Sequence, residues 1–375
     1  MGFSFVWPYC AISSISTPSF VDLVQMTNLE LNSNHPSWSM IGIIRIEKTF
    51  YRELLSCSNF LGKIGQIYQK GFDLVREDGR LIHFRGGTWL HSPFGVVLDQ
   101  PIPKWVEGVS LREGDIFERK GRLLQRRTRD GCYIQLNPSY IVDLKRTLRF
   151  RPPQRETLLY EIQLLSEEIF KWSRFGGMAG ALSLLAEELP SLPFISLIPI
   201  SFWSRHALPR VRKLISSVIH EDLDDFGLAW EALLGLGPGL TPAADDFLVG
   251  FLAAHKLFSS PFGERLGDDG VKTRLEERAR IKTVPTSSQF LKCALEGIFS
   301  EILYLAFDDL RSSAENGGRE HIEYFLKWGH SSGADTLTGV VFGLWSMIPP
   351  GGDLKPPMKV IPRWTTTREQ YTLDT

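Results

Sequence analysis

The residues best suited to chemistry lie in a glycine-rich stretch that is followed directly by two aspartates. Residues 235–250 have the sequence GLGPGLTPAADDFLVG, in which Thr241 and Pro242 precede the acidic pair Asp245 and Asp246. Thr is a good helix N-cap, and Pro is well tolerated at the first helical position, where a missing N–H costs little. The pattern predicts a loop with bare backbone N–H groups that leads into a helix.

Such a helix start attracts anions, because its free N–H groups and its dipole together carry roughly half a positive charge. Asp245 and Asp246 would repel the same anion, and a hard cation such as Mg²⁺ that bridges carboxylate and phosphate oxygens would resolve the conflict. The alternative is that the two acids only complement the helix dipole and that nothing binds. In the first interpretation, the anion-binding residues of this stretch are Gly237, Gly239, Leu240 and Thr241.

A second stretch nearer the C-terminus has a similar order of residue types. Residues 329–339 have the sequence GHSSGADTLTG, and when Asp335 is aligned with Asp246, Gly339 coincides with Gly250. Gly inside a helix costs about 1 kcal/mol relative to Ala, so the matched glycines predict close contact between two helices. Two such helix starts facing each other would form one pocket, whereas two unrelated glycine-capped helices are the alternative.

The second stretch also adds a titratable group to the expected pocket. His330 is a candidate proton donor or anion contact, because imidazole titrates near neutral pH. We take Asp246, Asp335 and His330 as candidate catalytic residues, and Asp245 joins the two other aspartates as a candidate ligand of Mg²⁺. The remaining anion-binding candidates are Ser331, Ser332 and Gly333.

Other catalytic patterns fit this chain poorly. Residues 329–333 match the letters G-x-S-x-G, but a helical pattern precedes them where a nucleophile elbow needs a strand. The loop before Thr241 lacks the lysine of a Walker A motif and follows a helical pattern, which argues against P-loop and dinucleotide-binding sites. His91 and Ser92 are neighbours in an extended segment, so their side chains point to opposite faces. A place on the wall of a pocket between domains suits them better than a catalytic pair.

The overall composition is that of an ordinary globular protein. The 375 residues are 43% hydrophobic and carry a net charge of −1, which gives no general argument for nucleic acid or an anionic membrane. The four cysteines are scattered without a C-x-x-C motif, which argues against a structural zinc site. The apolar N-terminus lacks a basic region, and the apolar run 192–203 is too short to span a bilayer. We expect a cytoplasmic protein.

The hydrophobic pattern predicts two domains of different secondary structure. Residues 1–38 form an irregular lead-in, and residues 39–150 show alternating patterns and glycine turns typical of a β-rich barrel or sandwich. Apolar residues then recur at helical spacing, so residues 151–348 should form an all-helical domain that carries both glycine-rich stretches. Residues 349–375 form a proline-rich tail. The expected fold class is α+β.

Two segments within these domains need separate interpretation. The basic run from Arg119 to Arg129 could suit a nucleic acid or an acidic partner, but few aromatic residues are interleaved, and a solvent-exposed hairpin explains it better. Residues 258–285 are charged and contain several glycines, so we expect a mobile loop, with one short helix as the alternative.

The two glycine-rich stretches resemble those of the AllH-like family. The resemblance rests on residues 237–242 with the acidic pair and on residues 329–335, and it extends from about Ile43 to about Leu344. It implies a subunit of an oxamate carbamoyltransferase, which phosphorolyses oxalurate to oxamate and carbamoyl phosphate. It also implies FdrA-like and AllG-like subunits as partners.

The implied substrates agree with the residues, because carbamoyl phosphate and oxamate are both anions that N–H donors would suit. Each of the two motifs departs from the family pattern: Ala243–Ala244 stands where Ser-Gly is frequent, and Ala334 stands where Trp is frequent. Without the serine hydroxyl one possible ligand contact is absent, so these residues do not fix the identity of the substrate. Two hypotheses follow, an enzyme subunit for carbamoyl transfer and a non-catalytic partner that stabilises an FdrA-like subunit.

Overall fold

The computed structural model describes residues 40–57, 60–68, 70–87, 92–128, 132–145, 155–172, 176–185, 197–316 and 318–348. The expected lead-in (1–38) and tail (349–375) therefore lie outside the described residues, as do His91 and Arg129.

The N-terminal part of the described chain is a closed β-barrel. Its strands pair in the order β5-β4-β3-β2-β6-β7-β8-β1-β9, and an antiparallel pairing of β5 with β1 closes eight of them into a ring. Strands β8 and β9 follow one another along the same side of β1, both parallel to it. The strands are β1 (Met40–Glu47), β2 (Leu61–Tyr68), β3 (Gly71–Arg76), β4 (Leu81–Gly86), β5 (Gly95–Leu98), β6 (Ile116–Lys120), β7 (Leu123–Arg126), β8 (Tyr133–Gln135) and β9 (Tyr140–Val142).

Alternating side chains explain why these segments form a barrel. Ile82 and Phe84 of β4 are buried inside, whereas the intervening polar residues His83 and Arg85 face the other way. Phe84 stacks on Phe72 of β3 with 4.9 Å between ring centroids. Two short helices, α2 (Lys48–Ser56) and α3 (Ile102–Gly108), accompany the strands.

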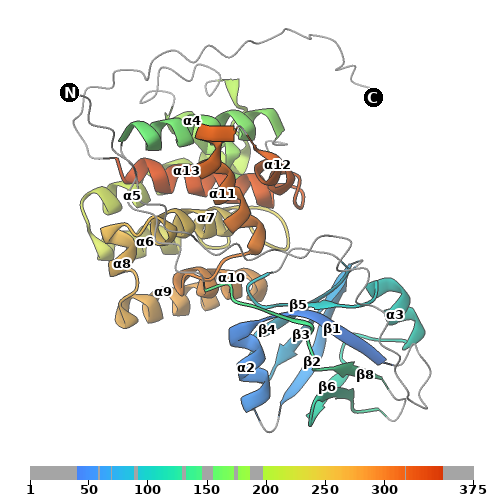
Figure 1. Cartoon of the computed structure of the whole chain (residues 1–375). Coiled ribbons are helices and arrows are strands. Elements are labelled where there is room, and N and C mark those ends of the chain that lie inside the picture. The colour runs from blue at the N-terminus through green and yellow to red at the C-terminus, as the bar shows by residue number, and fades with distance from the viewer. Residues whose placement is uncertain are drawn as a thin grey trace, which may run out of the picture.

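The C-terminal part is helical, which confirms the expected α+β fold class (Figure 1). Where a loop was expected at residues 258–285, the structure has two helices, α8 and α9. The elements are α4 (Arg155–Trp172), the 3₁₀ helix η1 (Met178–Leu185), α5 (Phe202–Ile219), α6 (Leu223–Leu233), α7 (Ala243–Leu257), α8 (Pro261–Arg265), α9 (Asp269–Lys282), α10 (Pro285–Leu295), α11 (Glu301–Asn316), α12 (Glu320–Leu326) and α13 (Ser332–Ser346).

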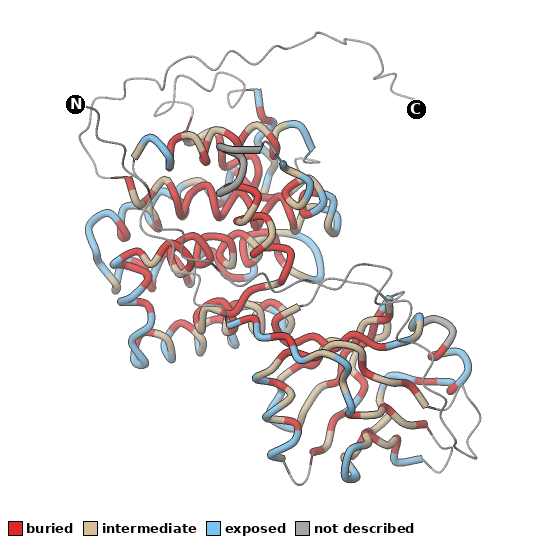
Figure 2. Tube along the Cα trace, in the orientation of Figure 1, coloured by how far each residue is buried: buried red, intermediate tan, exposed pale blue. Residues whose placement is uncertain are grey.

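Helices α7 and α13 form the centre of this helical part. Contacts run from α4 to α13, from α13 to α7, and from α7 to α10, so the four helices form successive layers. Both central helices are buried along nearly their whole length, as the red tube in Figure 2 shows. A helix that is apolar on all sides is stable only when other elements cover it completely.

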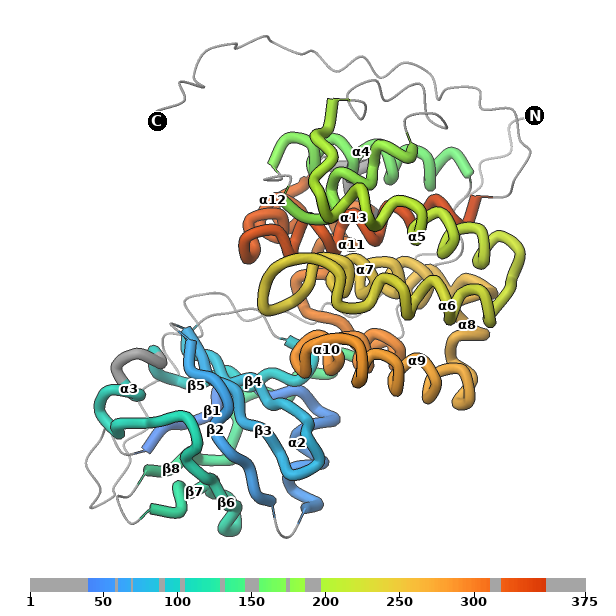
Figure 3. Tube along the Cα trace, turned by 180° about the vertical axis from the view of Figure 1, so that it is seen from behind, coloured from blue at the N-terminus to red at the C-terminus, as the bar shows by residue number. Residues whose placement is uncertain are grey.

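The two parts meet where α10 and α11 approach the barrel, as the reverse view in Figure 3 shows for α10. Phe290 of α10 packs edge-on against Phe94, which precedes β5, with 4.7 Å between ring centroids. Arg45 of β1 forms an ion pair of 2.7 Å with Glu301 of α11. The hydroxyl of Tyr304 donates to the carbonyl of Leu144. Apolar, ionic and hydrogen-bonding contacts thus join barrel and helices.

Candidate functional site

The predicted close contact between two glycine-bearing helices is confirmed. A Cβ added at Gly250 of α7 would collide with the carbonyl of Thr336, and one added at Gly339 of α13 would collide with the carbonyl of Phe247. A Cβ at Gly343, one turn further along α13, would meet Ala254, which is nearer the C-terminal end of α7. The helices therefore run in the same direction, and their N-termini lie at the same end.

The contacts of the two glycines are equivalent. Gly250 lies against the Thr336 carbonyl and the Val340 amide, and Gly339 lies against the Phe247 carbonyl and the Phe251 amide. Under the alignment of Asp335 with Asp246, Thr336 corresponds to Phe247, and Val340 corresponds to Phe251. The α7–α13 pair therefore has local two-fold symmetry about an axis between the helices.

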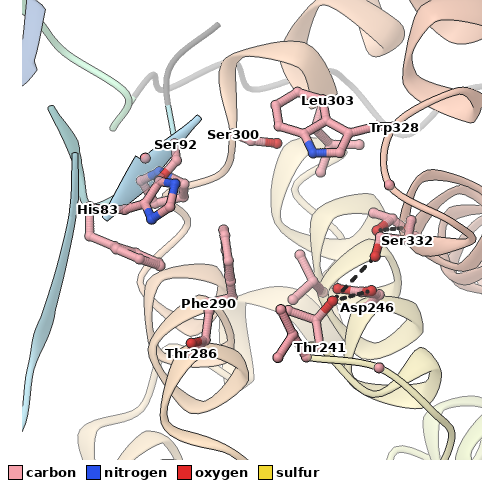
Figure 4. A pocket seen from close by; sticks show the side chains of 18 of the residues that line it. His83, Ser92, Thr241, Asp246, Thr286, Phe290, Ser300, Leu303, Trp328 and Ser332 are labelled. Atoms are coloured by element: carbon pink, nitrogen blue, oxygen red, sulfur yellow. Dashed lines mark hydrogen bonds between the residues drawn. The ribbon is translucent and has the colours of Figure 1, made fainter. Parts of the chain in front are cut away.

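The two helix starts meet through side chains (Figure 4). The Thr241 hydroxyl donates to Asp246 Oδ2 over 3.0 Å and lies 3.2 Å from the hydroxyl of Ser332. These contacts join the loop before α7 to the first turn of α13, across 91 residues of sequence. The expected meeting of the two helix starts is thus present in the structure.

The expected capping of α7 by Thr241 is wrong. Pro242 occupies the N-cap position, where its apolar side chain can provide no hydrogen bond, and the Thr241 hydroxyl is directed to Asp246. The first-turn amides of α7 donate to backbone carbonyls: Ala244 to Leu236, and Asp245 to Pro242. These two amides are therefore already satisfied.

The glycines of the loop are required by its backbone conformation. Gly235, Gly237 and Gly239 have φ values of 73°, 115° and 107°, in the left-handed region that residues with a Cβ rarely adopt. A Cβ at Gly237 would also lie 2.8 Å from the amide nitrogen of Ala243. The loop consequently folds back against the start of α7.

The three candidate aspartates have different surroundings. Asp245 is 1% exposed; its Oδ1 accepts from the Gly235 amide at 2.9 Å, and its Oδ2 accepts from the Thr283 hydroxyl. Burial raises the pKa of this carboxyl, and the hydrogen bonds from Thr283 and Gly235 partly offset that rise. Asp245 thus fastens the glycine-rich loop to the residue that follows α9.

Asp335 faces the start of η1. It is 1% exposed, its Oδ1 accepts from the Met178 amide at 2.5 Å, and its Oδ2 has no hydrogen bond of normal geometry within the described chain. The backbone at Gly177 lies so close that a Cβ there would overlap the carboxyl group. Burial raises the pKa of Asp335 to about 7.

Asp246 differs from both because it lies on the wall of a cavity (Figure 4). Burial is the main cause that raises its pKa well above the usual value, and the nearby charge of Asp335 raises the pKa further. Hydrogen bonds from Ser332 and Thr241 act in the opposite direction. The environment therefore favours the protonated form of Asp246.

The arrangement does not suit the expected magnesium site of three carboxylates. Asp245 accepts hydrogen bonds on both oxygens, from the Gly235 amide and the Thr283 hydroxyl, Asp335 accepts one from the Met178 amide, and neither residue lines the cavity beside Asp246. Within the described ranges, no group of three or more His, Cys, Asp or Glu side chains could hold a metal ion. Magnesium stays a prediction from the sequence.

The cavity has a volume of about 640 Å³ and lies between the barrel and the helices. On the helical side, both helix starts contribute, together with α10, α11 and the end of α12. The predicted site residues that line it are Gly239, Leu240, Thr241, Asp246, His330, Ser331 and Ser332. The predicted site residues outside its lining are Gly237, Gly333, Asp245 and Asp335.

Residues 233–344 match the model of the family described as oxamate carbamoyltransferase subunit AllH. This match confirms the resemblance inferred from the two glycine-rich stretches, and it points to a subunit associated with a carbamoyltransferase complex. No solved structure matches the chain. None of the described helices is both long enough and apolar enough to cross a membrane.

The AllH match includes both helix starts, but it does not include the barrel that forms the opposite wall of the cavity. That wall contains polar residues that the sequence analysis missed: Tyr68, Lys70, Asp73, His83 and Arg85. Ser92 also lies there, as expected for the wall of a pocket between domains. The alternation of β4 places His83 and Arg85 outside the barrel, but the sequence did not indicate which element covers that face.

Proposed function

We propose that this chain binds a small anion in the cavity between barrel and helices, as a subunit of a carbamoyltransferase-type complex. The observation that carries the proposal is the meeting of Thr241, Asp246 and Ser332 on one cavity wall, inside the segment that matches AllH. The Ser332 hydroxyl and a protonated Asp246 carboxyl are hydrogen-bond donors, which suit phosphate and carboxylate oxygens, and the Thr241 hydroxyl holds Asp246 in place.

The raised pKa of Asp246 lessens the electrostatic conflict that suggested magnesium. A protonated carboxyl does not repel an anion and has a proton to give. In oxalurate phosphorolysis, a phosphate oxygen bonds to the ureido carbon and the bond from that carbon to the oxamate nitrogen breaks. The leaving nitrogen needs a proton, and we assign its donation to Asp246, with His330 as a second candidate on the same wall. The attacking hydrogen phosphate loses one proton as carbamoyl phosphate forms, and this proton restores the donor.

Partner subunits belong to the proposal, because AllH is described as one subunit of an enzyme. FdrA-like and AllG-like chains are the partners that the resemblance implies. Catalysis should then be measured in the assembled complex, whereas anion binding should be measurable on this chain alone.

The binding test is calorimetric titration of the full chain with carbamoyl phosphate and with oxamate, each with and without Mg²⁺. Ser332→Ala removes a donor to the anion, and Thr241→Val removes the hydroxyl that holds Asp246. Each should weaken the affinity roughly tenfold, since a hydrogen bond to a charged group contributes about 1.5–3 kcal/mol. Normal affinity in the double variant would contradict the proposed site.

The catalytic test uses the complex with all partner subunits. Asp246→Asn should abolish most of the turnover, and Asp224→Asn, at an exposed acid in the first turn of α6, should leave it unchanged. Wild-type turnover by the Asp246 variant would refute the catalytic assignment.

One observation favours a second candidate, a non-catalytic subunit that stabilises an FdrA-like partner. Leu240, at the tip of the glycine-rich loop, is 64% exposed although it is large and apolar. A partner subunit would cover it, whereas a small anion would not. In that case the chain should form a stable complex with the partner through Leu240. The melting temperature of the isolated chain should not change when carbamoyl phosphate is added.

A further inference from the structure

The barrel wall of the cavity contains a chain of hydrogen bonds that ends on an arginine. In the antiparallel pairing of β3 with β4, Asp73 lies opposite His83, and Gly71 lies opposite Arg85. The Tyr68 hydroxyl donates to Asp73 Oδ2 over 2.6 Å. On the other oxygen, Asp73 Oδ1 lies 2.5 Å from His83 Nδ1. Asp73 itself is only 4% exposed.

Arg85 fixes the protonation of His83 within this chain. The Arg85 Nε–H can only donate, so His83 Nε2, at 2.6 Å, must accept and carries no proton. The ring proton then resides on Nδ1 and is donated to Asp73. The imidazole is thus a neutral connector between a buried carboxylate and a guanidinium.

The Arg85 guanidinium is also fixed from the helical side. Its Cζ lies 5.5 Å from the centroid of the Trp328 ring, which follows α12 and lines the same cavity. A Cβ at Gly71 would collide with the Phe84 carbonyl oxygen at 2.5 Å and would also lie 3.3 Å from Arg85 Cγ and 3.4 Å from His83 Nε2, so glycine keeps this strand close to β4 and to the pair. A planar cation is thereby held in a defined orientation at the junction of the two parts.

A second observation, independent of the arginine, concerns Ser92 on the same cavity wall. Ser92 is one of the residues that line the cavity, and its buried hydroxyl oxygen has no hydrogen-bond partner among the residues that the structure describes. Figure 4 shows Ser92 beside His83, across the cavity from Thr241, Asp246 and Ser332. Most buried hydroxyls are paired in native proteins, so an unpaired one in a residue of the cavity wall has hydrogen-bonding capacity left for a bound polar group.

We propose that Arg85 and Ser92 bind the carboxylate of the substrate, with His83 and Asp73 as positioning residues that orient the guanidinium. This inference rests on the proposed function and divides the cavity: the barrel holds the planar carboxylate end, and the helix starts hold the carbamoyl or phosphate end. Guanidinium groups match a carboxylate with two parallel hydrogen bonds, which favours a planar oxamate-like acid at this wall.

The test compares oxamate with inorganic phosphate by calorimetric titration of the full chain. Arg85→Gln should weaken oxamate binding at least tenfold and leave phosphate binding within about twofold of the wild type. The matched control is Arg122→Gln, which removes an exposed arginine of the same barrel that does not line the cavity and should change neither affinity.

Ser92→Ala keeps the proposal testable if the arginine variant does not fold, because it removes a hydroxyl that has no partner among the described residues. It should keep the wild-type melting temperature and lower the affinity for oxamate severalfold. Asp73→Asn should lower that affinity less than Arg85→Gln does, and combining the two changes should add no further loss. A purely structural role of Asp73 would instead give additive losses and equal weakening of phosphate.

The outcomes separate this inference from the proposed function. Wild-type oxamate affinity in both Arg85→Gln and Ser92→Ala overturns the carboxylate site and leaves the anion site at the helix starts standing. Loss of phosphate binding equal to the loss of oxamate binding in Arg85→Gln also overturns the division of the cavity. If the wild type binds neither anion, the proposed function fails, and this inference fails with it.

Discussion

The three aspartates chosen from the sequence show how strongly the surroundings of a carboxyl group determine its role. Asp245 accepts two hydrogen bonds and holds a loop, Asp335 is buried against the η1 backbone, and Asp246 faces the cavity. Their positions near helix starts were evident from the sequence. The directions in which their side chains point were not evident, because they depend on Thr283 and Met178, which lie far away along the chain.

At Asp335, the raised pKa predicts a pH-dependent stability. The folded state holds the proton up to about pH 7, whereas an unfolded Asp releases it near pH 4, so the free energy of unfolding should fall as pH rises between these values. Asp335→Asn mimics the protonated carboxyl and should remove that contribution, on the order of a few kcal/mol. Urea titrations at several pH values from 4 to 8 would measure it, and parallel curves for the two proteins would contradict the assignment.

At Asp246, the raised pKa predicts that anion binding weakens with increasing pH. Deprotonation would place a negative charge beside the ligand and remove a donor, so the affinity for oxamate should fall as pH rises above the ordinary carboxyl range. Asp246→Asn should bind oxamate with a flatter pH profile, and Asp224→Asn should retain the wild-type slope. Oxamate suits this titration because its carboxylate stays ionised throughout. A wild-type slope in the Asp246 variant would exclude this carboxyl as the titrating group.

At the scale of elements, the parallel pair of α7 and α13 depends on two glycines. Gly250→Ala or Gly339→Ala would press a methyl group into a backbone carbonyl of the facing helix and should destabilise the protein by about 3 kcal/mol. Gly227→Ala is the matched control: its Cβ would come no closer than 3.4 Å, to the Arg278 guanidinium, so the gain in helix propensity should prevail. Thermal denaturation of the three variants would measure these changes in stability. Equal effects at Gly227 and Gly250 would contradict the packing described above.

The sequence predicted this helix pair because its signal is local: a glycine at the same distance from an acid in two helices. It did not predict the two helices at residues 258–285, whose buried faces consist of only a few apolar residues. In α9, Val271, Leu275 and Ala279 repeat every four residues among many charged ones. Side-chain caps from Ser260 and Asp268 also start these helices at positions that resemble turns in the sequence.

At the scale of the whole molecule, the site belongs to neither part alone. The helix starts supply hydroxyls and a carboxyl, the barrel supplies Arg85 and His83, and contacts such as Arg45 with Glu301 hold the parts together. The α+β class and the order of the two domains followed from the change in hydrophobic period. The barrel wall did not, because outward-facing polar residues on a strand are ordinary until the fold covers them with a second domain.

The most direct test of a cavity that binds anions from two sides is a crystal structure of the full chain grown with carbamoyl phosphate and oxamate. We expect the anions in the cavity, with phosphate or carbamoyl oxygens within hydrogen-bond distance of Thr241 and Ser332, and with the oxamate carboxylate on Arg85. A structure from a crystal with saturating ligand would contradict the account if its cavity contained only water, or if the anions bound only elsewhere on the protein.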